Sequence, residues 1–150
     1  MKNEMRLEFR ALSENEAFAR TAVAAFVTQL NPTLEEISDI KTAVSEAVTN
    51  AVIHGYDGIR QEENKVWIHC LIKDDVLEVE IRDMGVGIEN VEKAMEPLYT
   101  TKPELERSGM GFSFMEAFMD DLEVVSEVGQ GTTVHMLKKL GTSSWIGGLG

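Results

Sequence analysis

The stretch SEAVTNAVIHG, Ser45–Gly55, reads as the second half of an apolar helix, yet it carries Glu46 and Asn50 four residues apart. Residues at i and i+4 lie on one face of a helix, about 6 Å apart along its axis. This acid and amide border the apolar stripe. From periodicity alone they could be rim residues, with the acid solvated and the amide bonded to backbone, or two groups of one site.

The start of this helix is predicted from the preceding residues, NPTLEE. Thr33 is expected as the N-cap and Glu36 as the third helical residue, which together make a capping box. Apolar residues then recur at helical spacing until Gly55, a typical C-terminal glycine. We therefore expect a helix over residues 34–54. Its apolar stripe consists of Ile37, Ile40, Val44, Ala47, Val48 and Ala51.

Further elements are predicted on both sides of this helix. Residues 14–30 have helical spacing, and Ser13 with Glu16 predicts a second capping box. The order of predicted helices and strands along the chain indicates one domain over residues 1–140. Its expected fold is a two-layer α+β sandwich with helices on one face of a mixed, mainly antiparallel sheet. The glycine-rich residues 141–150 are expected to be a disordered tail. Alternation of apolar and polar residues predicts strands at 5–11, 66–73, 76–83, 122–127 and 132–139. Helical spacing predicts a helix over 111–121, a helical turn is expected near 91–96, and the remaining residues are expected to form loops.

Composition excludes several classes of protein. The chain has 150 residues, 43% of them apolar, and a formal charge of −12. Such a charge opposes direct nucleic-acid binding, which depends on cations that displace counterions. No run approaches the roughly 18 apolar residues of a membrane span, and the first residues lack an apolar leader, so we expect a cytoplasmic protein. A single cysteine, Cys70, excludes an internal disulfide and is expected to be buried in a strand.

Three glycine segments could carry chemistry. In RDMGVGIE, Asp83 ends a strand and precedes Gly85 and Gly87, so its carboxylate could accept a hydrogen bond from a ligand amine. In RSGMGF, Gly109 and Gly111 open a helix, whose free N–H groups favour phosphate. The third segment, GQGTT, leads into the last strand. Taken singly, each could also be an ordinary turn or cap.

Together with the acid and amide, these segments predict one nucleotide site. The side-chain oxygen of Asn50 suits Mg²⁺, which shares its sites with phosphates. Glu46 could act as a general base toward a hydroxyl or water that attacks the γ-phosphate.

The four motifs, in this order, resemble the ATPase superfamily that joins gyrase, Hsp90-type chaperones, histidine kinases and MutL, whose nucleotide pocket is the Bergerat fold. The likeness covers about residues 5–138. PLYTTKPELERSGMGFSFME and MKNEMRLEFRALSENEAFAR resemble, more narrowly, the anti-sigma-F factors of spore-forming Bacillus relatives. That resemblance implies a homodimeric, Mg²⁺- and ATP- or ADP-binding serine kinase. It also implies that the protein inhibits a sporulation sigma factor and phosphorylates a serine of an anti-anti-sigma factor.

The resemblance also implies roles for single residues. Glu46 is the general base and Asn50 the Mg²⁺ ligand. Asp83 takes the adenine amino group beside Gly85 and Gly87. The other implied roles are Thr132 near the adenine, Arg20 as a partner contact, Thr100, Thr101, Lys102 and Arg107 in an ATP lid over 89–108, and Ser108, Gly109, Met110 and Gly111 around the phosphates.

Two other functions remain to be weighed. A histidine kinase is disfavoured, because His54, His69 and His135 lie at a helix end and in strands, with no long dimerisation helix to present an acceptor. A module that sequesters its partner with ATP bound, but without significant kinase turnover, fits the same motifs.

Overall fold

A five-stranded sheet and the helices on one of its faces make up the described part of the computed structural model, residues 2–96 and 111–141. The order of elements along the chain is the predicted one. The strands are β1 Lys2–Arg10, β2 Lys65–Lys73, β3 Val76–Asp83, β4 Asp121–Glu127 and β5 Gly131–Lys139. The helices are η1 Ser13–Asn15, α1 Glu16–Val27, η2 Thr28–Leu30, α2 Leu34–Asn50, η3 Ala51–Gly55, α3 Val91–Ala94 and α4 Gly111–Phe118.

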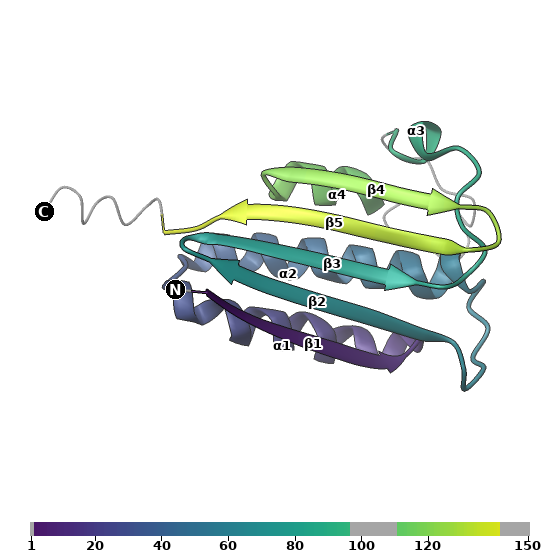
Figure 1. The fold of residues 1–150 in the computed structure, drawn as a ribbon, viewed down its shortest axis with the longest axis horizontal. Coiled ribbons are helices and arrows are strands. Elements are labelled where there is room, and N and C mark those ends of the chain that lie inside the picture. Colours follow the sequence, from purple (N-terminus) through teal and green to yellow (C-terminus); the bar gives the residue numbers. More distant parts are fainter. Residues whose placement is uncertain (1, 97–110, 142–150) are drawn as a thin grey trace, which may run out of the picture.

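The strands follow the order β1-β2-β3-β5-β4 across the sheet, and β1 is an edge strand as predicted. All four pairings are antiparallel, so the described residues contain no parallel pair of the kind that a mixed sheet would have. Figure 1 shows α1, α2 and α4 on the same face of the sheet. The predicted two-layer α+β sandwich is therefore confirmed. No helix in the described part of the chain is long and apolar enough to cross a membrane.

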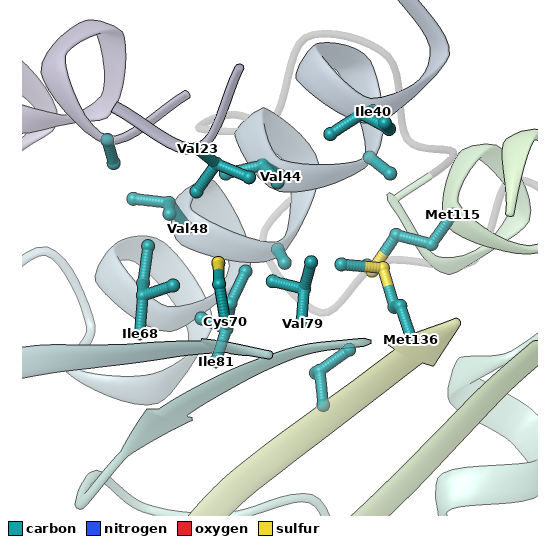
Figure 2. Close-up of a cluster of buried hydrophobic side chains, with 14 of the residues drawn as sticks. Val23, Ile40, Val44, Val48, Ile68, Cys70, Val79, Ile81, Met115 and Met136 are labelled. Atoms are coloured by element: carbon teal, nitrogen blue, oxygen red, sulfur yellow. The ribbon is translucent and has the colours of Figure 1, made fainter. Parts of the chain in front are cut away.

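The core lies between this helical layer and the sheet. In Figure 2, Val44 and Val48 of α2 point toward Cys70 and Val79 of the sheet, and all four side chains are fully buried. Burial raises the pKa of the Cys70 thiol to about 12, so it stays protonated and serves as a small core residue, as predicted. The apolar stripe of α2 is thus the surface that fixes the helix on the sheet.

The predicted capping box of α2 is confirmed. Thr33 Oγ1 accepts the Glu36 N–H at 3.0 Å, and the Glu36 carboxylate accepts the Thr33 N–H at 2.9 Å. The helix itself ends at Asn50, and a π-helical turn, η3, continues to Gly55. The predicted range 34–54 therefore spans two kinds of helix.

The predicted capping box at Ser13 is wrong. Ser13 lies in the 3-10 turn η1, and α1 begins three residues later with Asn15 as an N-cap that makes no side-chain cap bond. Glu16 instead accepts hydrogen bonds from Arg20 and Ser45. An ionised arginine donor makes a stronger bond than a backbone N–H, which explains why the carboxylate turns away from the helix start.

Candidate active site

Asp83 is a buried carboxyl group at the end of β3, with only 6% of its surface exposed. Its Oδ1 accepts the Gly85 N–H at 2.9 Å. Burial raises the pKa of Asp83 to about 6, although the backbone N–H groups of Gly85 and Thr132 act in the opposite direction. A carboxylate that is costly to ionise gains from a further hydrogen-bond donor, which a ligand could supply.

The η3 turn, which continues α2, packs directly on the turn that follows Asp83. A Cβ atom on Gly85 would overlap the carbonyl oxygen of Gly55, and that oxygen accepts the Val86 N–H at 2.8 Å. A Cβ on Gly55 would lie 2.9 Å from the Asp83 carboxyl atoms. The η3 turn thus brings the helix that carries Asn50 onto the aspartate turn.

The turn between β4 and β5 closes the same end of the sheet. Gly87 has φ +78°, and a Cβ there would overlap the backbone of Glu127. The Gly129 N–H donates to the Val86 carbonyl at 2.8 Å. The segments RDMGVGIE and GQGTT therefore lie side by side, as one nucleotide site requires.

Thr132 and Ser126 continue this site across the sheet. Thr132 on β5 is the cross-strand partner of both Asp83 on β3 and Ser126 on β4. Thr132 is buried, and its Oγ1 lies 2.7 Å from the Ser126 Oγ. Ser126 lies outside the sequence motifs that predict the site. Its alternation with Leu122 and Val124 was the available signal, because it places a polar side chain on the inward face of β4.

Tyr56 is a second residue that the sequence did not indicate. It is 8% exposed, and its hydroxyl donates to the Lys65 carbonyl at 2.6 Å and accepts the Met84 N–H at 2.8 Å. Burial raises the pKa of Tyr56, so the hydroxyl stays protonated and can do both. The Tyr56 hydroxyl thereby links the turn that follows Asp83 to the start of β2.

Glu46 and Asn50 occupy the same face of α2, one turn apart and both half-buried, as predicted. Glu46 lines a groove of about 440 Å³ between α1 and α2. Arg20 of α1 lines it too, which the sequence did not predict. The Arg20 Nη1 donates to both oxygens of Glu16, at 2.8 and 2.6 Å, and Ser45 Oγ donates to the same carboxylate at 2.5 Å.

The predicted phosphate-binding helix start is described only at Gly111, the first residue of α4. After α4, the Asp120 N–H donates to the Leu137 carbonyl, near the end of the sheet opposite Asp83. The start of α4 therefore points toward the end that holds Asp83, as Figure 1 shows. Seven predicted site residues lie outside the described residues: Thr100, Thr101, Lys102, Arg107, Ser108, Gly109 and Met110.

Comparisons with known proteins identify the family to which the chain is similar. Residues 9–138 match the family model of the histidine kinase-like ATPase domain. An anti-sigma F factor of Oceanobacillus iheyensis is 58% identical over 146 residues, which cover 97% of this chain and 99% of the relative. An anti-sigma F factor of Bacillus thuringiensis is 56% identical over 144 residues, 96% of this chain and 97% of the relative.

A solved structure shares the fold. The crystal structure of the RsbU and RsbW domains of a Mycobacterium tuberculosis protein matches 92% of this chain with a TM-score of 0.64 and 20% sequence identity. The match spans 32% of that longer chain. The fold, the arrangement of the motifs and the near full-length relatives lead to one assignment: the chain belongs to the anti-sigma F factor family, within the histidine kinase-like ATPase domains.

Proposed function

We propose that this chain uses one nucleotide site to act as a protein serine kinase and as an inhibitor of a sporulation sigma factor. The observation that carries the proposal is Asp83, a buried carboxyl group with a raised pKa that lies between two glycine turns. It lies at the end of the sheet that is reached by the part of α2 that carries Glu46 and Asn50. Its relatives are anti-sigma F factors that match it over nearly their whole length. The site is proposed to take ATP or ADP with Mg²⁺.

The adenine end of the site is built from backbone turns and two polar side chains. The Asp83 carboxylate accepts a hydrogen bond from the exocyclic amine of the base. Gly85 and Gly87 form the adjacent wall, where the absence of side chains lets the base approach the backbone. Thr132 presents its hydroxyl beside Asp83, since the two residues are cross-strand partners.

The phosphate end is built around α2 and the start of α4. MgATP, when bound, supplies the transferable phosphoryl group and a cation that neutralises its charge. Asn50 contributes an amide oxygen to the Mg²⁺. Within the described residues, no group of three or more histidine, cysteine or acidic side chains could hold a metal ion, which fits an ion that takes its other ligands from phosphate and water. The remaining proposed phosphate contacts are Gly111, Thr100, Thr101, Lys102, Arg107, Ser108, Gly109 and Met110.

Glu46 is the proposed general base. It lies one helical turn before Asn50, so a serine hydroxyl that enters near the Mg²⁺ ligand could pass its proton to this carboxylate as the phosphoryl group is transferred. Glu46 also lines the groove that contains Arg20, which gives a polypeptide a route to the base.

This groove is the proposed surface for protein partners. Its lining includes the cations Arg20 and Lys41 and the 87% exposed side chain of Leu34. In its contacts with described residues, Arg20 donates only through Nη1, so its Nη2 and Nε edge can receive an acidic side chain. Cations gathered in a chain of net charge −12 favour an acidic segment of the partner.

The proposed partners are the sporulation sigma factor, which the chain inhibits, and an anti-anti-sigma factor, which it phosphorylates on serine. A second copy of the chain completes the proposed homodimer. Because the sigma factor acts in transcription, the proposed location is the cytoplasm.

The test is to incubate the protein with radiolabelled ATP and Mg²⁺ in the presence of the candidate anti-anti-sigma factor, and to map the labelled residue. Label on one serine of the partner, lost when Mg²⁺ is chelated, is the expected result. ATP binding and sigma-factor retention without any label would instead identify a sequestering module without kinase turnover.

A further inference from the structure

The Ser126 hydroxyl has three hydrogen-bond contacts but only one proton to donate. Its Oγ accepts the Ile88 N–H at 2.7 Å, lies 3.1 Å from the Gly131 carbonyl oxygen, and lies 2.7 Å from the Thr132 Oγ1. A serine hydroxyl has one proton and two lone pairs. The Ile88 N–H takes one lone pair, so the proton must go either to Gly131 or to Thr132.

These two choices fix what Thr132 offers to a ligand. If Ser126 donates to the Gly131 carbonyl, Thr132 donates to Ser126 and has only lone pairs left. If Ser126 donates to Thr132, the Thr132 proton is available to an acceptor on a ligand, and the longer contact with Gly131 is lost. Both arrangements use the same heavy-atom positions, so the change needs only rotation of two hydroxyl groups.

The neighbouring Asp83 decides which arrangement a bound adenine requires. This inference rests on the proposed adenine site. The edge of adenine that carries its amine presents a donor at that amine and an acceptor at the adjacent ring nitrogen, N1. Asp83, when ionised, can only accept, so it takes the amine. The N1 acceptor then needs a donor, and the hydroxyl of the cross-strand partner Thr132 is the polar group beside Asp83.

We propose that Ser126 is a positioning residue for base recognition: it donates to Thr132 and so directs the Thr132 proton toward N1 of adenine, directly or through one water. The Ile88 N–H holds the Ser126 oxygen in place while its proton changes partner. Ser126 thus acts through Thr132 and need not touch the nucleotide.

The experiment compares ATP with 1-deaza-ATP, in which N1 is replaced by a C–H group. Dissociation constants are measured by calorimetry for the full chain and for its Ser126→Ala, Ser126→Thr and Thr133→Ala variants. The wild-type chain is expected to prefer ATP by about fivefold to tenfold, the value of one hydrogen bond. Ser126→Ala should reduce this preference, because the Thr132 hydroxyl loses the donor that fixes its orientation toward N1. Ser126→Thr, which keeps a hydroxyl on a strand-favouring residue, should retain the preference.

Thr133→Ala is the matched control. It removes a hydroxyl one position further along β5, from a side chain on the other face of the sheet, and should leave the preference unchanged. The inference would be overturned if Ser126→Ala weakened the binding of ATP and 1-deaza-ATP by the same factor, or if it kept the wild-type preference for ATP.

A further variant separates failure of the inference from failure of the site. If Asp83→Asn leaves the affinity for ATP unchanged, the proposed adenine site is wrong, and the role of Ser126 is wrong with it. If Asp83→Asn weakens ATP binding while Ser126→Ala keeps the preference for ATP, the site stands and the role of Ser126 is overturned.

Discussion

Replacing Asp83 by asparagine should make the protein without nucleotide less sensitive to pH, while it weakens nucleotide binding. The pKa of Asp83 is raised from 3.8 to about 6 by burial. The folded state therefore holds the proton more tightly than the unfolded chain. The resulting stabilisation is fully present below pH 3.8 and is lost as the pH rises through about 6.

The magnitude follows from these two values. Between pH 5 and pH 7.5, ionisation of this one group should lower the free energy of unfolding of the wild-type protein by about 1.4 kcal/mol. The Asp83→Asn variant lacks this contribution. Urea denaturation of both proteins at the two pH values, without nucleotide, measures the difference. Identical pH dependence of the two proteins would show that Asp83 does not titrate in this range and would refute the reasoning.

The same titration should appear in nucleotide affinity. If only ionised Asp83 accepts the amine of the base, the dissociation constant for ATP should be about twice its high-pH value at pH 6 and about eleven times that value at pH 5. ATP phosphate titrates in the same range, so the Asp83→Asn variant serves as the reference for that effect. An affinity of this variant equal to the wild-type value would remove the adenine assignment.

Three further substitutions test the surroundings of the site. Lys138→Ala should destabilise the protein by about 2–4 kcal/mol, because the buried ammonium donates to the Phe118 carbonyl at the end of α4 at 2.7 Å. In urea denaturation, Lys139→Ala, at an exposed residue, should stay near wild type, and an equal loss of unfolding free energy in both variants would contradict the role of Lys138. Gly85→Ala should cost about 1–3 kcal/mol of unfolding free energy and greatly weaken ATP binding measured by calorimetry, since its Cβ would overlap the Gly55 carbonyl at the end of η3. Unchanged ATP binding would argue against this close packing. Thr33→Ala should cost about 1 kcal/mol of unfolding free energy with ATP affinity preserved, and a variant as stable as wild type would mean that the capping box contributes nothing.

Elements with local signals could be predicted from the sequence. The capping box at Thr33 and the helical spacing of α2 both depend on residues close together in the chain, and each is found as predicted. The capping box at Ser13 failed in part for the opposite reason. Glu16 is held by Arg20, one helical turn later, and also by Ser45, which is 29 residues away and which no local pattern reports.

The candidate site divides in the same way. Asp83 and the glycine segments were visible because a carboxylate and flexible turns follow strands at recognisable spacing. Ser126 and Tyr56 were not, since their importance comes from contacts across the sheet and between turns. The groove that joins Arg20 to Glu46 depends on how α1 packs against α2, which periodicity leaves open.

The most direct test of the central claim is phosphate transfer by the Glu46→Gln variant. With the amide in place of the carboxylate, the side chain keeps its size but can no longer take the serine proton. ATP and sigma-factor binding should stay within about threefold of wild type, while the rate of transfer to the serine of the anti-anti-sigma factor should fall at least about a hundredfold. Transfer at the wild-type rate would contradict the role of Glu46 as the base.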